Sequence, residues 1–142
     1  MLAYLDNELT DKEKRRTIKY MKQYKTLDAI IQSKELELLP SHTVEFREKP
    51  TQRSNQFHSE AEEYAIKSEE VEHYKRVKRV LDIAYRSTKP LHQVIWNEHF
   101  IDDLADVEVF FGRGISKRTY YKEKNELIKI VAECLRVAQI ST

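Results

Sequence analysis

Scarcity of turn-forming residues is the feature that most constrains how this chain can fold. Its 142 residues include only two glycines and three prolines, so few positions can form sharp turns. Leucine, lysine and glutamate, which favour helix, are frequent instead. Both glycines, Gly112 and Gly114, lie two residues apart, directly before a basic segment with an apolar helical pattern. The sequence therefore predicts an all-α protein with one special turn near its C-terminus.

The N-terminal part of the chain, residues 1–39, is predicted to be a helical segment. Thr10 and Glu13 have the T-x-x-E spacing of a capping box, which marks the start of a helix over about residues 10–38. Its apolar stripe is loose, and we expect the helix to break in two near residues 25–26. A lone pair of such helices is marginally stable without a partner surface.

A polar linker and a long helix are predicted next. Residues 40–57 contain two prolines and few large apolar side chains, which is typical of a linker, in part disordered, with a brief extended piece near residues 44–46. A second capping box, Ser59 with Glu62, then opens a helical apolar pattern about 28 residues long. This central helix begins a helical domain over residues 58–142. It is either the spine for the C-terminal helices or a coiled-coil-like dimer strip.

Three shorter elements follow the central helix. Pro90 suits the first turn of a short helix, where its missing N–H is not needed. Further helices are expected over about residues 102–111 and 116–137. Two helices joined by so short a turn have the form of a helix-turn-helix, which we place at about residues 101–137.

The two glycines are expected to build the turn of that motif. Gly112 can take the left-handed conformation that ends helices, and Gly114 allows a second unusual backbone angle. Ile115 supplies an apolar anchor between the helices. Ser116 is a good N-cap for the helix that follows. In a helix-turn-helix the second helix enters the major groove of DNA with its N-terminal residues toward the bases.

The last helix is predicted to have one buried and one cationic face. The buried face is marked by Tyr120, Leu127, Ile128, Val131 and Cys134 or Leu135. The outward face carries Lys117, Arg118, Tyr121, Lys122 and Asn125. Such cations contact phosphates, while Arg and Asn form paired hydrogen bonds to bases. Residues 112–129 hold six Lys or Arg against two Glu, a local net charge of +4 in a chain of +1. This pattern predicts DNA binding through the last helix.

The segment "ISKRTYYKEKNELIKIVAECL" resembles the C-terminal signature of the phage-encoded ArpU/RinA transcriptional regulators. Their helix-turn-helix is similar to region 4 of sigma factors, and the likeness extends more weakly to the layout of the whole chain. The resemblance implies activation of late phage operons through promoter DNA. It places DNA contacts at Ser116, Lys117, Arg118, Thr119, Tyr121 and Lys122. The turn "FFGRGIS" is about two residues longer than the usual family form, which gives Arg113 a phosphate contact.

Other binding sites and catalytic functions find little support. His92 and His99 share a helical face near Glu98, Asp102 and Asp103, but the H-x-x-x-H and E-x-x-H spacings of metal sites are missing there. We expect no metal, no cofactor and no enzymatic activity. The basic cluster "YKRVKR" at residues 74–79 is either a solvated face or a phosphate contact. Trp96 is expected in the core rather than at a ligand.

The location of the protein is predicted from what the sequence lacks. The N-terminus has no basic leader followed by an apolar core, and no apolar run approaches the roughly 20 residues that cross a bilayer. The single cysteine, Cys134, excludes an internal disulfide and a cysteine zinc site. We therefore expect a soluble protein of the bacterial host cytoplasm, with no membrane contact.

The function predicted from these observations is sequence-specific DNA binding by a phage or prophage transcriptional regulator. Its partners would be double-stranded promoter or operator DNA, host RNA polymerase and a second copy bound through the long helix. Three alternatives stay open. These are a protein that mainly contacts polymerase, a helical phage packaging or assembly component, and a small nuclease that uses the acids at residues 102–106.

Overall fold

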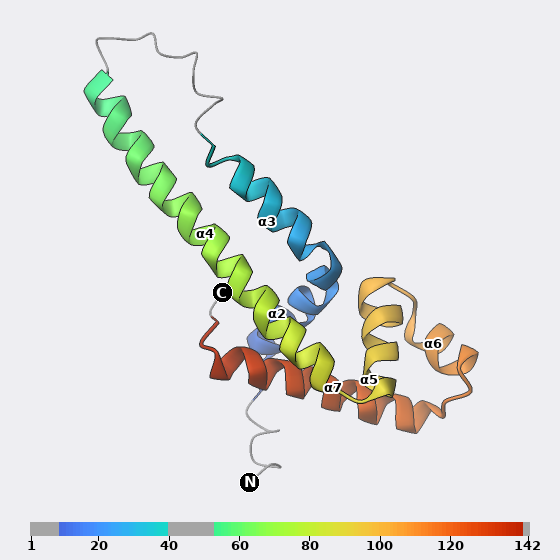
Figure 1. Ribbon diagram of the computed structural model, residues 1–142. Coiled ribbons are helices and arrows are strands. Elements are labelled where there is room, and N and C mark those ends of the chain that lie inside the picture. The colour runs from blue at the N-terminus through green and yellow to red at the C-terminus, as the bar shows by residue number, and fades with distance from the viewer. Residues whose placement is uncertain (1–8, 40–52, 141–142) are drawn as a thin grey trace. The chain divides into compact units, whose positions relative to one another are not determined.

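The structure is a computed structural model that describes residues 9–39 and 53–140, with side chains from residue 60 onward in the second range. These residues are helical and contain no strand, which confirms the predicted all-α fold (Figure 1). The chain divides into two units, and we describe each by itself. One unit comprises Met1–Lys25 with Val77–Thr142, and the other is Thr26–Arg76. Among the described helices, none is both long and apolar enough to cross a membrane.

The first helix begins where the capping box predicts. Helix α2 spans Asp11–Gln23, the Thr10 hydroxyl accepts from the Glu13 N–H at 3.1 Å, and the Glu13 carboxylate accepts from the Thr10 N–H at 3.1 Å. One face of α2 is buried through Thr17, Tyr20 and Met21. A 3-10 turn, η1 (Tyr24–Thr26), follows and confirms the predicted break.

The second unit contains α3 (Leu27–Leu36) and the first part of α4 (Arg53–Ser87). Leu27, Ile31 and Val71 are buried. Ion pairs join α3, or the residue after it, to α4. Their N···O distances are 3.4 Å for Lys34–Glu70, 3.0 Å for Lys75–Glu35 and 3.9 Å for Lys67–Glu37. Ion pairs therefore join the two helices, while the buried side chains of this unit named above are apolar.

The start of α4 corrects the sequence prediction. The helix begins at Arg53, so Ser59 lies inside it rather than at its N-terminus, and residues 53–57 are helix rather than linker. No proline or glycine occurs between Pro50 and Ser59, so nothing in the sequence stops the helix from extending upstream of the capping residues. The rest of the expected linker, including the extended piece at residues 44–46, lies outside the described residues.

The core of the first unit gathers around Trp96. Helix α5 (Pro90–Ile95) has its proline at the first position, as predicted, and continues into a π-helical turn, η4 (Trp96–Ile101). The Trp96 side chain is fully buried, and its indole N–H donates to the Met21 carbonyl at 3.0 Å. The Tyr24 and Tyr85 rings each lie with centroids 5.2 Å from the Trp96 ring. The tryptophan is therefore a core residue that joins α2 to η4.

Two helices complete the first unit: α6 (Asp106–Gly112) and α7 (Lys117–Val137). The bounds of α7 match the prediction, but α6 starts four residues later than expected. Asp103 has a left-handed backbone (φ 65°), and the Leu104 N–H donates to the Glu98 carbonyl at 2.9 Å. Aspartate tolerates this conformation better than most residues, so residues 102–105 form a turn instead of a helical start.

Candidate nucleic-acid interface

The turn between α6 and α7 needs only one of the two glycines. Gly114 has φ +69°, its N–H donates to the Phe111 carbonyl at 3.3 Å, and the Ile115 N–H donates to the Phe110 carbonyl at 2.8 Å. This is the hydrogen-bond pattern of a Schellman motif, whose left-handed position suits glycine. Gly112 stays inside α6, so the prediction that it is left-handed was wrong. The helix ends one residue later than expected, at Gly112, and the left-handed position is Gly114.

Ser116 fixes the start of α7. Its side-chain oxygen accepts from the Thr119 N–H at 3.1 Å, which confirms the predicted N-cap. The Thr119 side chain is exposed. The first N–H groups of a helix form a positive end that favours an anion. The N-terminus of α7 is therefore both capped and polarised in the direction that attracts phosphate.

Asp106, the first residue of α6, holds α7 in place. Its carboxylate accepts from the Tyr120 hydroxyl at 2.6 Å and from the Lys124 ammonium at 3.0 and 3.1 Å. Burial alone would raise the pKa of Asp106, but these hydrogen bonds outweigh it and keep the pKa below its ordinary value. Burial, together with the Asp106 carboxylate, raises the pKa of the Tyr120 phenol. Both α7 side chains are thereby committed to the contact with α6.

The two faces of α7 are sorted as the sequence predicts. The buried side chains are Tyr120, Leu127, Ile128, Val131, Ala132 and Leu135, while Cys134 is half-buried. The exposed set comprises Lys117, Arg118, Thr119, Lys122 and Asn125. Among the residues that the structure describes, none of the three cations in this set has an acidic partner. A compact group of uncompensated positive charge therefore covers the first two turns of α7.

Tyr121 and Arg113 are less free than the other predicted contact residues. The Tyr121 side chain is 36% exposed, its ring lies edge-on to Phe110 and Tyr120, and its hydroxyl is 3.4 Å from Asp106 Oδ2. Arg113 donates to the Glu98 carboxylate, which raises the pKa of the guanidinium. Both side chains already have a partner within the motif.

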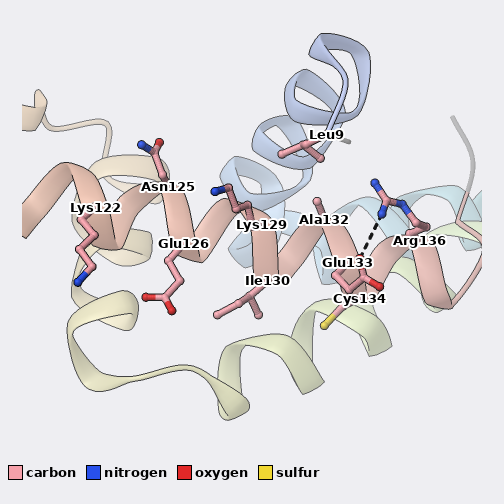
Figure 2. Close-up of a pocket in the computed structure, with 10 residues that line it drawn as sticks. All are labelled: Leu9, Lys122, Asn125, Glu126, Lys129, Ile130, Ala132, Glu133, Cys134 and Arg136. Carbon is pink, nitrogen blue, oxygen red and sulfur yellow. Dashed lines mark hydrogen bonds and ion pairs between the residues drawn. The ribbon is translucent and has the colours of Figure 1, made fainter. Parts of the chain in front are cut away.

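A hollow of about 680 Å³ is lined by side chains of α7 between Lys122 and Arg136 and by Leu9 (Figure 2). Its walls include Lys122 and Asn125, two of the predicted contact residues, and Leu9 of the segment before α2. Asn125 and Leu9 lie on the same side of α7 in Figure 2, whereas Lys122 points the other way. The lining of the hollow thus includes part of the exposed cationic set and extends to the C-terminal half of α7.

Sequence reasoning missed a cluster beneath α7. The fully buried His92 has Nε2 2.8 Å from Glu123 Oε1 and 3.6 Å from Glu126 Oε1, and Lys89 Nζ lies 3.2 and 3.5 Å from the same two atoms. Burial raises the pKa of Glu123, but hydrogen bonds from His92 and Lys89 lower it by more. The three-residue spacing of the glutamates was a local signal that they share a face. No such local spacing connects the glutamates to Lys89 and His92, which lie at the start of α5 and within it.

This cluster differs from the metal site considered in the sequence. His92 joins two glutamates of α7, whereas His99 Nδ1 lies 2.7 Å from the Leu104 carbonyl and 3.3 Å from Asp106. One histidine and two carboxylates could hold a divalent ion in principle. Here the Lys89 ammonium already lies against both carboxylates, so the arrangement is an ion-pair network that fastens α7 to α5.

Comparisons with known proteins leave the family open. No family model matches the chain, and neither a curated protein nor a solved structure matches it. The resemblance to the ArpU/RinA regulators therefore rests on the sequence motif and, more weakly, on the layout of the chain, and it stays a prediction.

Proposed function

We propose that the protein binds double-stranded DNA in a sequence-specific way, by inserting the N-terminal half of α7 into a major groove. One observation carries the proposal. The cations in the N-terminal half of α7 divide into an inward one, Lys124, bound to Asp106, and three outward ones without acidic partners in the described chain. A surface that keeps like charges together and unpaired suits a polyanion.

The proposed contacts follow from the position of each side chain. Lys117 and Lys122, as mobile point charges, contact phosphates and set the register on the duplex. Arg118 and Asn125 offer the paired donors and acceptors that distinguish bases in the major groove. Tyr121, held by Phe110 and Asp106, presents a rigid ring edge to the bases.

Arg113 takes a secondary place in the proposed interface. Its bond to Glu98 neutralises part of its charge and links the turn to η4. A phosphate contact by Arg113 would have to share the guanidinium with that carboxylate. We therefore assign Arg113 mainly to holding the turn.

The biological role that we propose is transcriptional regulation of phage or prophage late genes in a bacterial host. It rests on the resemblance of the α7 segment to the ArpU/RinA signature. We propose a binding protein rather than an enzyme, since the titratable side chains that pack around α7, such as Asp106 and His92, are engaged in contacts that hold the helices together.

The test is selection of bound DNA from a random pool, followed by binding of variants to the selected site. We expect Arg118→Ala to lose about 1–3 kcal/mol at that site and to relax discrimination at one base pair. Arg86→Ala, which removes an exposed arginine at the end of α4, serves as the matched control and should bind normally. Equal binding by Arg118→Ala and wild type would remove Arg118 from the interface, and failure to select any DNA would exclude the function.

The selected site also reports the assembly. A palindrome indicates a symmetric dimer, because operator symmetry follows protein symmetry. A single half-site indicates a monomer or a protein that binds together with polymerase.

Contact with RNA polymerase is the second candidate, and the outer face of α6 favours it. Val107 and Phe111 are one helical turn apart and 55% and 82% exposed, and Leu104, in the turn before α6, is 38% exposed. Exposed apolar clusters of this kind mark contacts with other proteins. Purified polymerase should be retained by the wild-type protein without promoter DNA, and not by Phe111→Ala, if this candidate is right.

A further inference from the structure

Helix α2 and the turn after it carry a strong local positive charge. Residues 11–25 contain seven Lys or Arg against two acids, a local net charge of +5 in a protein whose total is +1. One face of α2 is buried here, since Thr17, Tyr20 and Met21 pack into the first unit. The remaining surface therefore holds most of the positive charge.

Four of these cations lie on one face of α2, opposite its buried residues. Lys12, Arg15, Lys19 and Lys22 follow each other at steps of three, four and three residues, which brings them onto one side of a helix. All four are exposed. We call them the α2 stripe. At a rise of 1.5 Å per residue the stripe is about 15 Å long.

The α2 stripe has no acidic counterpart within the described chain. None of its four side chains makes an ion pair there. The carboxylate of the nearby Glu13 pairs instead with Arg136, with an Oε1···Nη2 distance of 3.2 Å. Glu13 also caps the helix, and its bonds to the Thr10 backbone and to Arg136 lower its pKa. Neighbouring like charges at these spacings destabilise a helix unless an anion lies over them. The stripe therefore points to an external polyanion.

Its placement in the first unit links the stripe to the candidate DNA interface. The Arg136–Glu13 ion pair joins the last turn of α7 to the first turn of α2, and both helices belong to the same unit. Arg136 lies about 30 Å along α7 from Ser116, at 1.5 Å per residue. One turn of B-DNA is of similar length.

We propose that the α2 stripe binds phosphates of the same DNA duplex, about one helical turn away from the bases contacted by α7. This inference rests on the proposed function. An anionic membrane is the less favoured ligand, because an interfacial helix buries an apolar face in lipid, and Tyr20 and Met21 of α2 are already buried in protein. Contacts of this kind add affinity and salt dependence without sequence discrimination.

The experiment measures the slope of log affinity against log salt for the full chain on its selected site. Arg15→Gln/Lys19→Gln removes two charges from the stripe, and Lys14→Gln/Lys25→Gln removes two exposed charges from elsewhere in residues 11–25. We expect the stripe variant to lower the slope by about two, because each lost phosphate contact lowers it by about one. The ratio of specific to non-specific affinity should stay unchanged. The control variant should keep the wild-type slope.

Shortening the duplex tests the position of the contact. Removing about one helical turn of flanking DNA should lower the wild-type slope by at least as much as the stripe variant does. The same truncation should lower the slope of the stripe variant by less, because only Lys12 and Lys22 of the stripe remain in it. If the pair of charges disturbs folding, Lys19→Gln alone should lower the slope by about one.

The outcomes separate this inference from the proposed function. A stripe variant with the wild-type slope overturns the inference, while loss of discrimination in Arg118→Ala still supports DNA reading by α7. A wild-type protein that binds no duplex overturns both. If the wild-type protein bound vesicles rich in phosphatidylserine, and the stripe variant lost this binding while its DNA binding stayed intact, the stripe would be assigned to a membrane instead.

Discussion

The pair formed by α3 and the first part of α4, which we call the α3–α4 hairpin, and the first turns of α7 are both rich in cations. The two regions use these cations differently. In the hairpin the lysines face acids across the helix pair: Lys34 with Glu70, Lys67 with Glu37, and Lys75 with Glu35. In α7 the outward cations, Lys117, Arg118 and Lys122, have no acid within the described residues. The number of cations is similar, so it is the absence of pairing that distinguishes a candidate binding surface from an ordinary solvated one.

Energetics explain why this difference matters. Exposed ion pairs such as those of the hairpin typically contribute only about 0.2–1 kcal/mol each to folding, and they neutralise the surface. Unpaired clustered cations do not stabilise the fold, but they release counterions when they meet a polyanion. Asp106 shows the third use of charge, since it takes one α7 cation, Lys124, into a half-buried network.

The largest expected effect comes from removing the outward charges of α7. The triple variant Lys117→Gln/Arg118→Gln/Lys122→Gln should lose about a hundredfold or more in affinity for the selected DNA site, through one base contact and two phosphate contacts. Its thermal stability should stay at the wild-type value, because these side chains are exposed and unpaired. Fluorescence anisotropy and a melting curve measure the two properties.

The matched control is the hairpin triple, Lys34→Gln/Lys67→Gln/Lys75→Gln. It removes the same charge, and DNA affinity should change less than threefold while stability falls slightly. If both triples weakened DNA binding equally, total charge rather than unpaired charge would govern affinity, and the distinction between the two regions would be lost.

The next largest effect concerns Asp106, which keeps Lys124 on the inward side. Asp106→Asn leaves the Lys124 ammonium without a carboxylate and weakens the bond to Tyr120. Hydrogen bonds to charged groups contribute about 1.5–3 kcal/mol, so the free energy of unfolding should fall by roughly that amount. Urea denaturation measures it. An unchanged stability would show that Lys124 is as free as Lys122.

Acid should reproduce this loss in the wild-type protein. The pKa of Asp106 is lowered in the folded state, so its contribution to stability is complete above the ordinary value of 3.8 and is lost as pH falls through the lower folded value. The difference in melting temperature between wild type and Asp106→Asn should therefore be constant from pH 7 to about pH 5. It should shrink below about pH 4. A difference that persisted at pH 2 would mean that the charge of Asp106 is not its source.

Local features of the sequence predicted most of the helices and the orientation of α7. Thr10 and Ser116 cap helices because the capping bond joins residues three apart, and the faces of α7 follow from helical periodicity alone. The start of α4 failed because a capping pair is a local preference, and a sequence without breakers can extend past it. The left-handed position is Gly114 rather than Gly112 because α6 extends through Gly112.

The inner network of the site was beyond the reach of sequence. Asp106 and Lys124 are 18 residues apart, and His92 and Glu123 are 31 apart, so no helical spacing connects them. The sequence showed that α7 was basic, but it did not show which cations the fold neutralises. That distinction comes only from the packing of α5, η4 and α6 against α7.

The smallest expected effect isolates pairing from position. Glu35→Gln removes the closer partner of Lys75, whose second acid, Glu72, lies at 3.9 Å. Because the pair is exposed, the free energy of unfolding should fall by about 0.2–1 kcal/mol, and the loss should disappear in 1 M salt, where charges are screened within about 3 Å. DNA affinity should stay within twofold of wild type, since one released cation outside a cluster binds few phosphates. If the slope of log DNA affinity against log salt instead rose by one in this variant, pairing alone would keep Lys75 from DNA. A cation anywhere on the surface would then bind phosphate equally well once its acidic partner is removed.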